Sequence, residues 1–219
     1  MKKSFLVIGL GRFGSSVVKQ LYKSDCEVAV CDVEEDYIID LEDYFHHHVL
    51  GDAKEDTILD DLDVESFHTI IVSIGDAFES SVLITKKLKD RGCKHVIAKA
   101  KDRHRGEILE AVGADEVVYP EEEAGARIAR KISFKNIMEY IELNEQIGCV
   151  EVKVPTVFYG KTLSELSFTS KHGLTIALIL RNNKPVSNYF AHEKLQEGDC
   201  FLMVGDYKRL NKFIEKYYE

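Results

Sequence analysis

The Gly-Leu-Gly-Arg-Phe-Gly motif at residues 9–14 constrains this chain more than any other feature. A short apolar run, Phe5–Ile8, precedes it, and residues 13–22 carry apolar side chains at helical spacing. A second apolar run ends about twenty residues further on, at Asp32. A strand, a glycine turn, a helix and an acidic strand end in this order are typical of a dinucleotide-binding fold. The motif predicts a nucleotide site that contains Gly9, Gly11, Arg12, Phe13, Gly14 and Asp32.

Each residue type in this motif suits a part of a nucleotide. Glycines let backbone amides approach a phosphate at the start of a helix. The Asp32 carboxylate can accept hydrogen bonds from ribose hydroxyls and would repel a 2′-phosphate, which counts against NADP. The Arg12 guanidinium can contact the pyrophosphate of a dinucleotide, or the β- and γ-phosphates of ADP or ATP. The alternatives are a glycine turn without a ligand and an arginine that only faces solvent.

Three further segments follow or end predicted strands. Residues 51–53 and 73–76 follow the third and fourth strands, and Lys99 ends the fifth. Ligands of open α/β sheets bind at the carboxyl ends of the strands. The alternatives are ordinary turns and a solvated lysine. We therefore expect the same site to include Asp52, Ala53, Ile74, Gly75 and, as a second phosphate ligand, Lys99.

Apolar runs alternate with helical patterns up to Pro120, which predicts an α/β fold with a Rossmann-like, doubly wound parallel sheet. The runs lack polar alternation, as expected for strands covered on both faces. The predicted strands are Phe5–Ile8, Glu27–Cys31, His47–Leu50, Thr69–Val72, His95–Lys99 and Glu116–Tyr119. The predicted helices are Phe13–Tyr22, Glu34–Phe45, Glu55–Leu62, Glu79–Asp90 and Arg105–Val112.

After Pro120 the pattern predicts one long helix, from Glu121 to about Ile147, that contacts another domain or subunit. A smaller α+β module follows. Its predicted strands are Val150–Val154, Leu174–Leu180 and Cys200–Val204, and its predicted helices are Leu163–Leu166 and Tyr207–Tyr217. The expected domains are a nucleotide-binding lobe at 1–134, the end of a crossover helix at 135–147 and a regulatory lobe at 148–219.

Acidic, histidine and cysteine side chains are the candidate metal ligands of the chain. Glu121 stands at a helix start, which favours acids, and it is also a candidate to face the nucleotide through a cation. His46, His47 and His48 form a poor cage, because neighbouring strand residues point to opposite faces. The five cysteines form no CxxC pair and are expected to be reduced and packed as small apolar side chains.

Composition limits the classes of partner and activity. The net charge of −9 disfavours nucleic acid, which requires clustered basic residues. No window approaches about 18 consecutive apolar residues, and the first apolar run is too short for a signal peptide, so we expect no membrane insertion and a cytoplasmic location. No Ser-His-Asp elbow, HExxH motif or Walker A lysine is present, so nothing nominates an enzyme.

The chain resembles the RCK (regulator of potassium conductance) proteins that serve as regulatory subunits of Ktr/Trk-type potassium uptake systems. The resemblance covers essentially the whole chain. Its most specific part is the segment at 113–129, which precedes the predicted long helix and includes its start. The matching segments are GLGRFG at 9–14, DVEED at 32–36, GDA at 51–53, GADEVVYPEEEAGARIA at 113–129 and EGDCFLMVGD at 197–206.

This resemblance implies a gating function without catalysis. The N-terminal lobe would bind ATP or ADP, and in some members NAD(H). Arg12 would lie near the γ-phosphate, Asp32 at the ribose, Lys99 in the nucleotide site, and Glu121 beside the phosphates with Mg²⁺ or another cation. Homodimers would assemble into an octameric ring. The ring would dock on the cytosolic face of a membrane potassium-translocating subunit and gate it.

In Ktr-type members the C-terminal lobe binds cyclic di-AMP, and here this chain departs from the family. Residues 186–192 lack the proline that the family usually has before the Gly-Asp turn, which counts against cyclic di-AMP. The residues in that neighbourhood are Leu163, Leu166, His172 and Gly173. Two other functions remain open, a small NAD-dependent oxidoreductase and a free-standing nucleotide or redox sensor.

Overall fold

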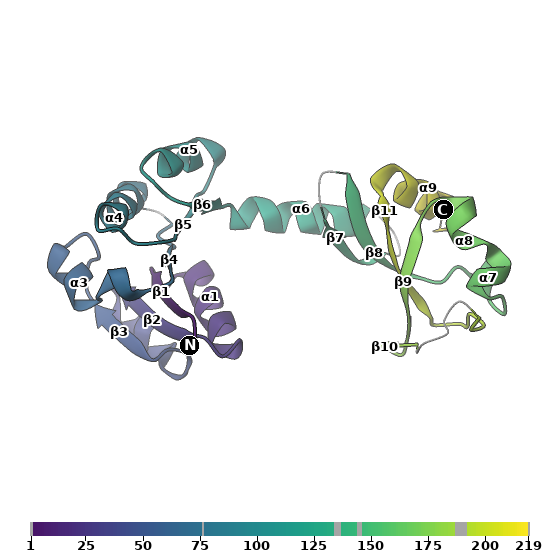
Figure 1. Ribbon diagram of the computed structural model, residues 1–219, viewed down its shortest axis with the longest axis horizontal. Coiled ribbons are helices and arrows are strands. Elements are labelled where there is room, and N and C mark those ends of the chain that lie inside the picture. Colours follow the sequence, from purple (N-terminus) through teal and green to yellow (C-terminus); the bar gives the residue numbers. More distant parts are fainter. Residues whose placement is uncertain (1, 76, 134–136, 144–145, 187–191, 219) are drawn as a thin grey trace. The chain divides into compact units, whose positions relative to one another are not determined.

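The computed structural model describes residues 2–75, 77–133, 137–143, 146–186 and 192–218 (Figure 1). The chain forms two compact units, Met1–Glu123 and Ala124–Glu219. Helix α6, Pro120–Ser133, begins in the first unit and continues into the second. None of the helices in the described part of the chain combines the length and apolar character that a bilayer-spanning helix needs.

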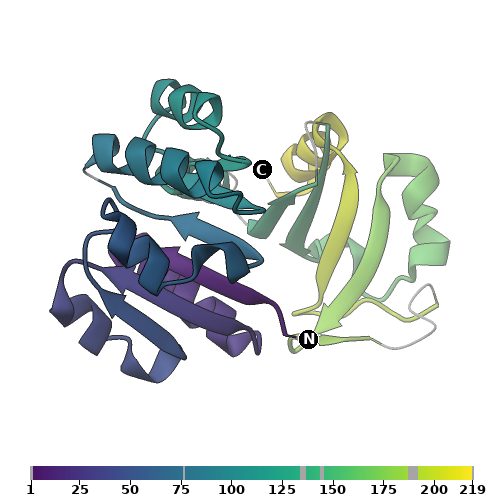
Figure 2. The ribbon, with the colours of Figure 1, turned by 60° about the vertical axis from the view of Figure 1, so that its left-hand side comes forward.

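The first unit is built on a six-stranded parallel sheet with the strand order β3-β2-β1-β4-β5-β6. Figure 2 shows its strands side by side. The strands are β1 Ser4–Ile8, β2 Glu27–Asp32, β3 His47–Leu50, β4 Thr69–Val72, β5 Val96–Lys99 and β6 Glu116–Val118. The helices are α1 Arg12–Lys23, α2 Glu35–Ile39, α3 Asp56–Asp61, α4 Phe78–Asp90 and α5 Arg103–Ala111, with 3₁₀ turns η1 Glu42–Tyr44 and η2 Val64–Ser66.

Helices cover both faces of this sheet. In Figure 1, α1 lies on one side of the strands, and α3 and α4 lie on the other. Alternate residues of β1 pack on opposite sides: Leu6 and Ile8 contact the α3–α4 layer, whereas Val7 contacts the α1–α2 layer. Because both faces are buried, the strands read as continuous apolar runs. The predicted doubly wound parallel sheet is confirmed.

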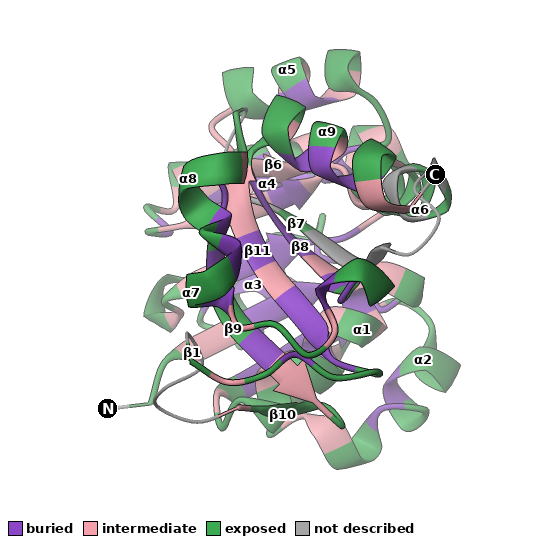
Figure 3. Ribbon diagram, turned by 90° about the vertical axis from the view of Figure 1, so that its right-hand side faces the viewer, coloured by how far each residue is buried: buried purple, intermediate pink, exposed green. Residues whose placement is uncertain are grey.

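The second unit contains a five-stranded sheet, β10-β9-β11-β8-β7, whose pairs are all antiparallel. Its strands are β7 Ile137–Glu142, β8 Ile147–Lys153, β9 Thr175–Arg181, β10 Lys184–Pro185 and β11 Cys200–Asp206. Its further elements are η3 Thr156–Phe158, α7 Leu163–Leu166, α8 Phe168–His172 and α9 Tyr207–Tyr218. Helices α7, α8 and α9 share one apolar core with one face of the sheet (Figure 3).

The prediction of one helix from Glu121 to Ile147 is wrong. The helix ends at Ser133, and Ile137–Glu142 forms β7, which pairs antiparallel with β8. The Leu143 N–H also donates to the Ile147 carbonyl at 3.0 Å. Isoleucine and tyrosine suit a strand as well as a helix, and pairing with β8 decides between the two.

Smaller differences concern element ends. The helix expected at Glu34–Phe45 is divided into α2 and η1, and neither β10 nor α8 was predicted. Four of the cysteines are buried and Cys26 is partly buried, so they pack as small apolar residues, as expected. The three domain ranges stay a prediction.

Candidate nucleotide-binding site

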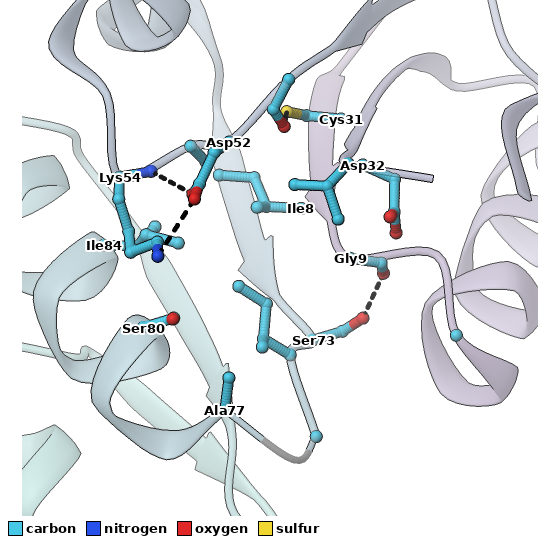
Figure 4. Close-up of a pocket in the computed structure, with 16 residues that line it drawn as sticks. Ile8, Gly9, Cys31, Asp32, Asp52, Lys54, Ser73, Ala77, Ser80 and Ile84 are labelled. Carbon is cyan, nitrogen blue, oxygen red and sulfur yellow. Dashed lines mark hydrogen bonds and ion pairs between the residues drawn. The ribbon is translucent and has the colours of Figure 1, made fainter. Parts of the chain in front are cut away.

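A cavity of about 360 Å³ opens where β1, β2, β3 and β4 end (Figure 4). Open α/β sheets bind ligands at this edge, and the volume lies in the usual range for small-molecule sites. Its lining includes many of the predicted residues together with side chains from the start of α4. The lining residues are Ile8, Gly9, Gly11, Cys31, Asp32, Val33, Gly51, Asp52, Ala53, Lys54, Ser73, Ile74, Gly75, Ala77, Ser80 and Ile84.

The glycine loop is closely packed at two positions and open at a third. A Cβ on Gly14 would overlap the Gly9 carbonyl oxygen and approach Ser73 Oγ to 2.5 Å. Gly9 has a positive φ of 91°, which favours glycine, and Ser73 Oγ donates a hydrogen bond to its carbonyl. At Gly11 no atom lies within 4 Å of an added Cβ, so a ligand can approach the backbone there.

Asp32 is oriented by the backbone on either side of it. Its Oδ2 accepts a hydrogen bond from the Leu10 N–H at 2.5 Å, and its Oδ1 accepts one from the Glu34 N–H at 3.0 Å. An ionised carboxylate has about four acceptor positions, so both oxygens can accept one more hydrogen bond. Asp32 thus fixes the glycine loop and remains able to accept bonds from a ligand.

At the end of β3, Asp52 pairs with Lys54, a lining residue that the sequence analysis missed. Asp52 Oδ1 accepts from the Lys54 N–H at 2.9 Å, and the Lys54 ammonium lies 3.0 Å from Oδ2. Burial acts to raise the pKa of Asp52, but the two hydrogen bonds from Lys54 outweigh it and the pKa is lowered. Lys54 follows the predicted Gly-Asp-Ala segment directly, so extending that segment by one residue would have included it.

Beside the cavity, the Lys99 ammonium lies 2.8 Å from Glu121 Oε1. It also lies 5.9 Å from the centroid of the Phe13 ring and 3.8 Å from where a Cβ on Gly75 would stand. The hydrogen bond from Lys99 is the main cause that lowers the pKa of Glu121. The predicted phosphate lysine and the predicted cation ligand therefore lie in direct contact.

Similarity to known proteins agrees with this geometry. The model of the TrkA-N domain family matches residues 5–120. The Ktr system potassium uptake protein C of Bacillus subtilis (strain 168) is 33% identical over 216 residues, which cover 99% of this chain and 98% of that protein. The chain belongs to the TrkA-N family. The resemblance to RCK proteins of Ktr systems is confirmed.

Solved structures share the fold of this TrkA-N chain. The GsuK RCK domain aligns with a TM-score of 0.65 at 20% identity, over 100% of this chain and 48% of that one. The GsuK channel bound to NAD aligns with a TM-score of 0.64 at 19% identity, over 96% of this chain and 38% of that one. The chain thus spans less than half the length of each of these two structures. Identities this low establish the fold alone.

The structure brings most of the predicted site residues of the TrkA-N unit together. Seven line the cavity, and their role in binding stays a prediction: Gly9, Gly11, Asp32, Asp52, Ala53, Ile74 and Gly75. Phe13 and Lys99 lie beside them. Gly14 is buried behind the glycine loop, and Arg12 is exposed at the first position of α1.

Cys31 contributes a buried thiol to the cavity lining. Burial, with the charges of Asp32 and Asp52, raises the pKa of the thiol to about 12. A thiol that stays protonated is a weak nucleophile, so Cys31 acts here as apolar lining. The apolar character of the strand predicted its burial but not its place beside two carboxylates.

A second cavity, of about 460 Å³, lies in the second unit between the end of α8 and helix α9. It is strongly basic, with Lys171, Arg209, Lys212 and Lys216 in its lining. His172 and Gly173 also line it, whereas Leu163 and Leu166 are buried in the core. Residues 186–192 lack the proline that the family usually has, and of these residues 187–191 lie outside the described part of the chain.

The donors present limit which cation the TrkA-N site can hold. Among the residues that the structure describes, no three His, Cys, Asp or Glu side chains are grouped to hold a metal ion. Glu121 offers a single carboxylate beside the cavity edge. That donor set suits Mg²⁺ only when phosphate oxygens and water complete the coordination.

Proposed function

We propose that this TrkA-N chain is a nucleotide-binding regulatory subunit that gates a membrane potassium channel or transporter, and that it is not an enzyme. The cavity at the strand ends carries the proposal. It combines an open approach to the Gly11 backbone with an oriented Asp32 carboxylate. These features suit the phosphates and the ribose of an adenine nucleotide, respectively.

The ligand is ADP or ATP, with NAD(H) as a further candidate. The Asp32 carboxylate disfavours a 2′-phosphate and therefore NADP. Arg12 is exposed at the start of α1, and we expect its guanidinium to contact a β- or γ-phosphate. Lys99 is the second cation for the phosphates. The GsuK channel, which shares this fold, binds NAD, and this supports nucleotide binding by the fold.

The partner is a membrane potassium-translocating subunit. Ktr system potassium uptake protein C matches this chain over nearly its full length, which supports a role in potassium uptake through that partner. The chain would then work at the cytoplasmic face of the cell membrane, held there by a protein contact. The net charge of −9 does not favour direct attraction to anionic lipid.

A second copy of the chain is the other proposed partner. The side chains of Ile128 and Ile132 on α6 are 57% and 76% exposed, although apolar residues at this spacing form one stripe of a helix. Covering that stripe with the same helix of another copy would form a homodimer, and dimers would assemble into an octameric ring. Gating requires that the nucleotide bind two states of this ring with different affinity.

Glu121 is the proposed protein ligand for a Mg²⁺ or similar cation that accompanies ATP. The cation would be held jointly by the carboxylate and the phosphate oxygens. The added charge of a third phosphate next to Arg12 then distinguishes ATP from ADP. Cyclic di-AMP is not part of the proposal, because residues 186–192 lack the proline that the family usually has there.

Calorimetric titration of the full chain with ATP, ADP, NADH and NADPH, each with and without Mg²⁺, tests the proposal. We expect ATP and ADP to bind, with a cation effect confined to ATP. The Arg12→Ala variant should lose the discrimination between ATP and ADP. Lys23→Ala, an exposed cation at the other end of the same helix, is the matched control.

Two outcomes would contradict the proposal in different ways. Tight NADH binding with weak adenine nucleotides, followed by turnover in a substrate screen, would indicate an oxidoreductase. Nucleotide binding without co-purification of a potassium-translocating membrane protein would indicate a free-standing sensor.

Unchanged discrimination between ATP and ADP in Arg12→Ala would remove Arg12 from the phosphate site.

A further inference from the structure

Lys99 pairs through its ammonium with Glu121 and borders the candidate nucleotide site. Its side chain is only 14% exposed, and its ammonium is bound to Glu121 Oε1 at 2.8 Å. Glu121 is 65% exposed, so its side chain is far more open to solvent than that of Lys99. The pair joins the carboxyl end of β5 to the first turn of α6.

The same ammonium borders the candidate nucleotide site. Gly75 lines the cavity, and a Cβ on Gly75 would stand 3.8 Å from Lys99 Nζ. The ring of Phe13, in the first turn of α1, is 5.9 Å from it. The first-turn amides of a helix are where a phosphate is expected to bind. A phosphate there would lie within reach of Lys99.

We propose that Glu121 is an internal competitor of the nucleotide, which holds the Lys99 ammonium until a phosphate takes it. This inference rests on the proposed function. An ammonium has three donors, but a phosphate and a carboxylate repel each other at close range when no cation lies between them. Without a divalent cation, nucleotide binding therefore displaces Glu121 from Lys99.

The exchange takes place at the start of the helix that connects the two units. Glu121 lies in the first turn of α6, and residues from Ala124 onward belong to the second unit. Release of Glu121 frees this turn from β5. Occupancy of the nucleotide site is thereby linked to the first turn of α6 without any direct contact between the ligand and that helix.

The competitor role and the cation-ligand role of Glu121 predict different changes in nucleotide affinity when its charge is removed. If Glu121 only holds a cation, removing its charge weakens ATP binding in Mg²⁺ and leaves ADP unaffected in EDTA. If Glu121 competes for Lys99, removing its charge strengthens ADP binding in EDTA. Measurements in EDTA therefore isolate the competitor role.

The test is a titration of the full chain with ADP in EDTA, using Glu121→Gln and Glu122→Gln. Glu122 is the next residue in the same turn and pairs with Arg103 at 2.6 Å, so it controls for the loss of an acid at the helix start. We expect Glu121→Gln to bind ADP about two- to fivefold more tightly, the range for one partly exposed ion pair. Glu122→Gln should match the unmodified chain.

A double-variant cycle assigns the effect to Lys99. Lys99→Met should weaken ADP binding, and adding Glu121→Gln to it should produce no further change, because the contested ammonium is gone. Hydrogen–deuterium exchange gives a second measurement. ADP should raise amide exchange in residues 121–128 of the unmodified chain and should not raise it further in Glu121→Gln.

The outcomes separate this inference from the proposed function. If the unmodified chain binds ADP and Glu121→Gln binds it equally or more weakly in EDTA, the competitor role is overturned while the proposed function stands. An equal gain in Glu122→Gln would also overturn it, because the effect would then come from the charge of the helix start. If the unmodified chain binds no adenine nucleotide, the proposed function fails and this inference fails with it.

Discussion

The two sheets of this chain differ in how many of their faces are covered. Helices pack on both faces of the parallel sheet in the first unit, and each β1 side chain from Leu6 to Ile8 is buried in one of two cores. In the second unit the helices share a core with one face of an antiparallel sheet. On the other face, which the strand register defines, Ile141 is 55% and Leu178 is 36% exposed.

This difference separates two ways of making contact with other molecules. A sheet covered on both faces has only its strand ends and loops available, and the candidate nucleotide site lies at those ends. A sheet covered on one face keeps a second face on which another surface can pack. Binding of small molecules is therefore expected in the first unit, and perturbation of one unit should leave the chemistry of the other intact.

The largest expected effect concerns the apolar core that helices α7, α8 and α9 share with the sheet of the second unit. Phe213 is 2% exposed, and its ring lies 5.3 Å from that of Phe168 and 4.8 Å from that of Tyr217. Phe213→Ala should cost about 3–5 kcal/mol of stability. Calorimetric unfolding should show the loss while ADP affinity is unchanged. Leu178→Ala on the other face is the control, and a loss of ADP binding in Phe213→Ala would show that the units are coupled.

A buried ion pair should have the next largest effect. Asp199 is fully buried, and it accepts from Arg181 Nε at 2.8 Å, from Arg181 Nη2 at 3.0 Å and from the Gln196 N–H at 2.9 Å. Asp199→Ala removes the buried carboxylate from Arg181, which keeps only its partly exposed partner Glu193 at 3.0 Å, and should cost about 2–4 kcal/mol in chemical denaturation. Asp90→Ala, which breaks the exposed pair with Lys86 in the first unit, should cost under about 1 kcal/mol. Equal losses would contradict the argument from burial.

The glycine loop tests the first unit by itself. A Cβ at Gly14 would overlap the Gly9 carbonyl oxygen, which belongs to the backbone and cannot rotate away. Gly14→Ala should therefore cost about 1–3 kcal/mol of stability and weaken ADP binding by roughly tenfold or more. Gly92→Ala, at a helix end with open space around it, should weaken stability by backbone strain without affecting ADP. Normal ADP affinity in Gly14→Ala would place the ligand elsewhere.

The smallest effect is a pH dependence confined to the second unit. Burial, and then the charges of Lys216 and Lys171, lower the pKa of His172 below its ordinary value of 6.5. The folded unit then binds fewer protons than the unfolded chain, so stability is complete above pH 6.5 and falls as the pH drops toward the folded pKa. In His172→Gln, the free energy of unfolding, measured against pH, should fall less steeply below pH 6.5. His104→Gln, at an exposed position on α5, is the control variant.

The sequence predicted the parallel sheet well because its signals are local. The apolar runs, the glycine stops at Gly92 and Gly113, and the Gly-Leu-Gly-Arg-Phe-Gly turn each specify an element without reference to distant residues. Ile137–Glu142 shows the limit of this reasoning. Its apolar pattern is compatible with a helix, and only its pairing with β8 makes it a strand.

The candidate site was predicted residue by residue, but its contacts were not. Motif reasoning placed Lys99 and Glu121 near one ligand, and nothing in their spacing indicated that they bind each other. The Asp52–Lys54 pair was missed for the same reason, because an ion pair depends on side-chain conformation more than on sequence order. Residue types identify what a site is able to hold, and only coordinates show which of its charges are already neutralised.

The two backbone hydrogen bonds to Asp32 have a consequence for which sugars the site accepts. Leu10 and Glu34 each use one acceptor position, one on each carboxylate oxygen, and this leaves one on each oxygen for a ligand. Two remaining acceptors match the two adjacent hydroxyls of a ribose. A 2′-deoxynucleotide would leave one carboxylate oxygen without its donor. We therefore expect this pocket to distinguish cellular RNA precursors from DNA precursors, although it reads no base sequence.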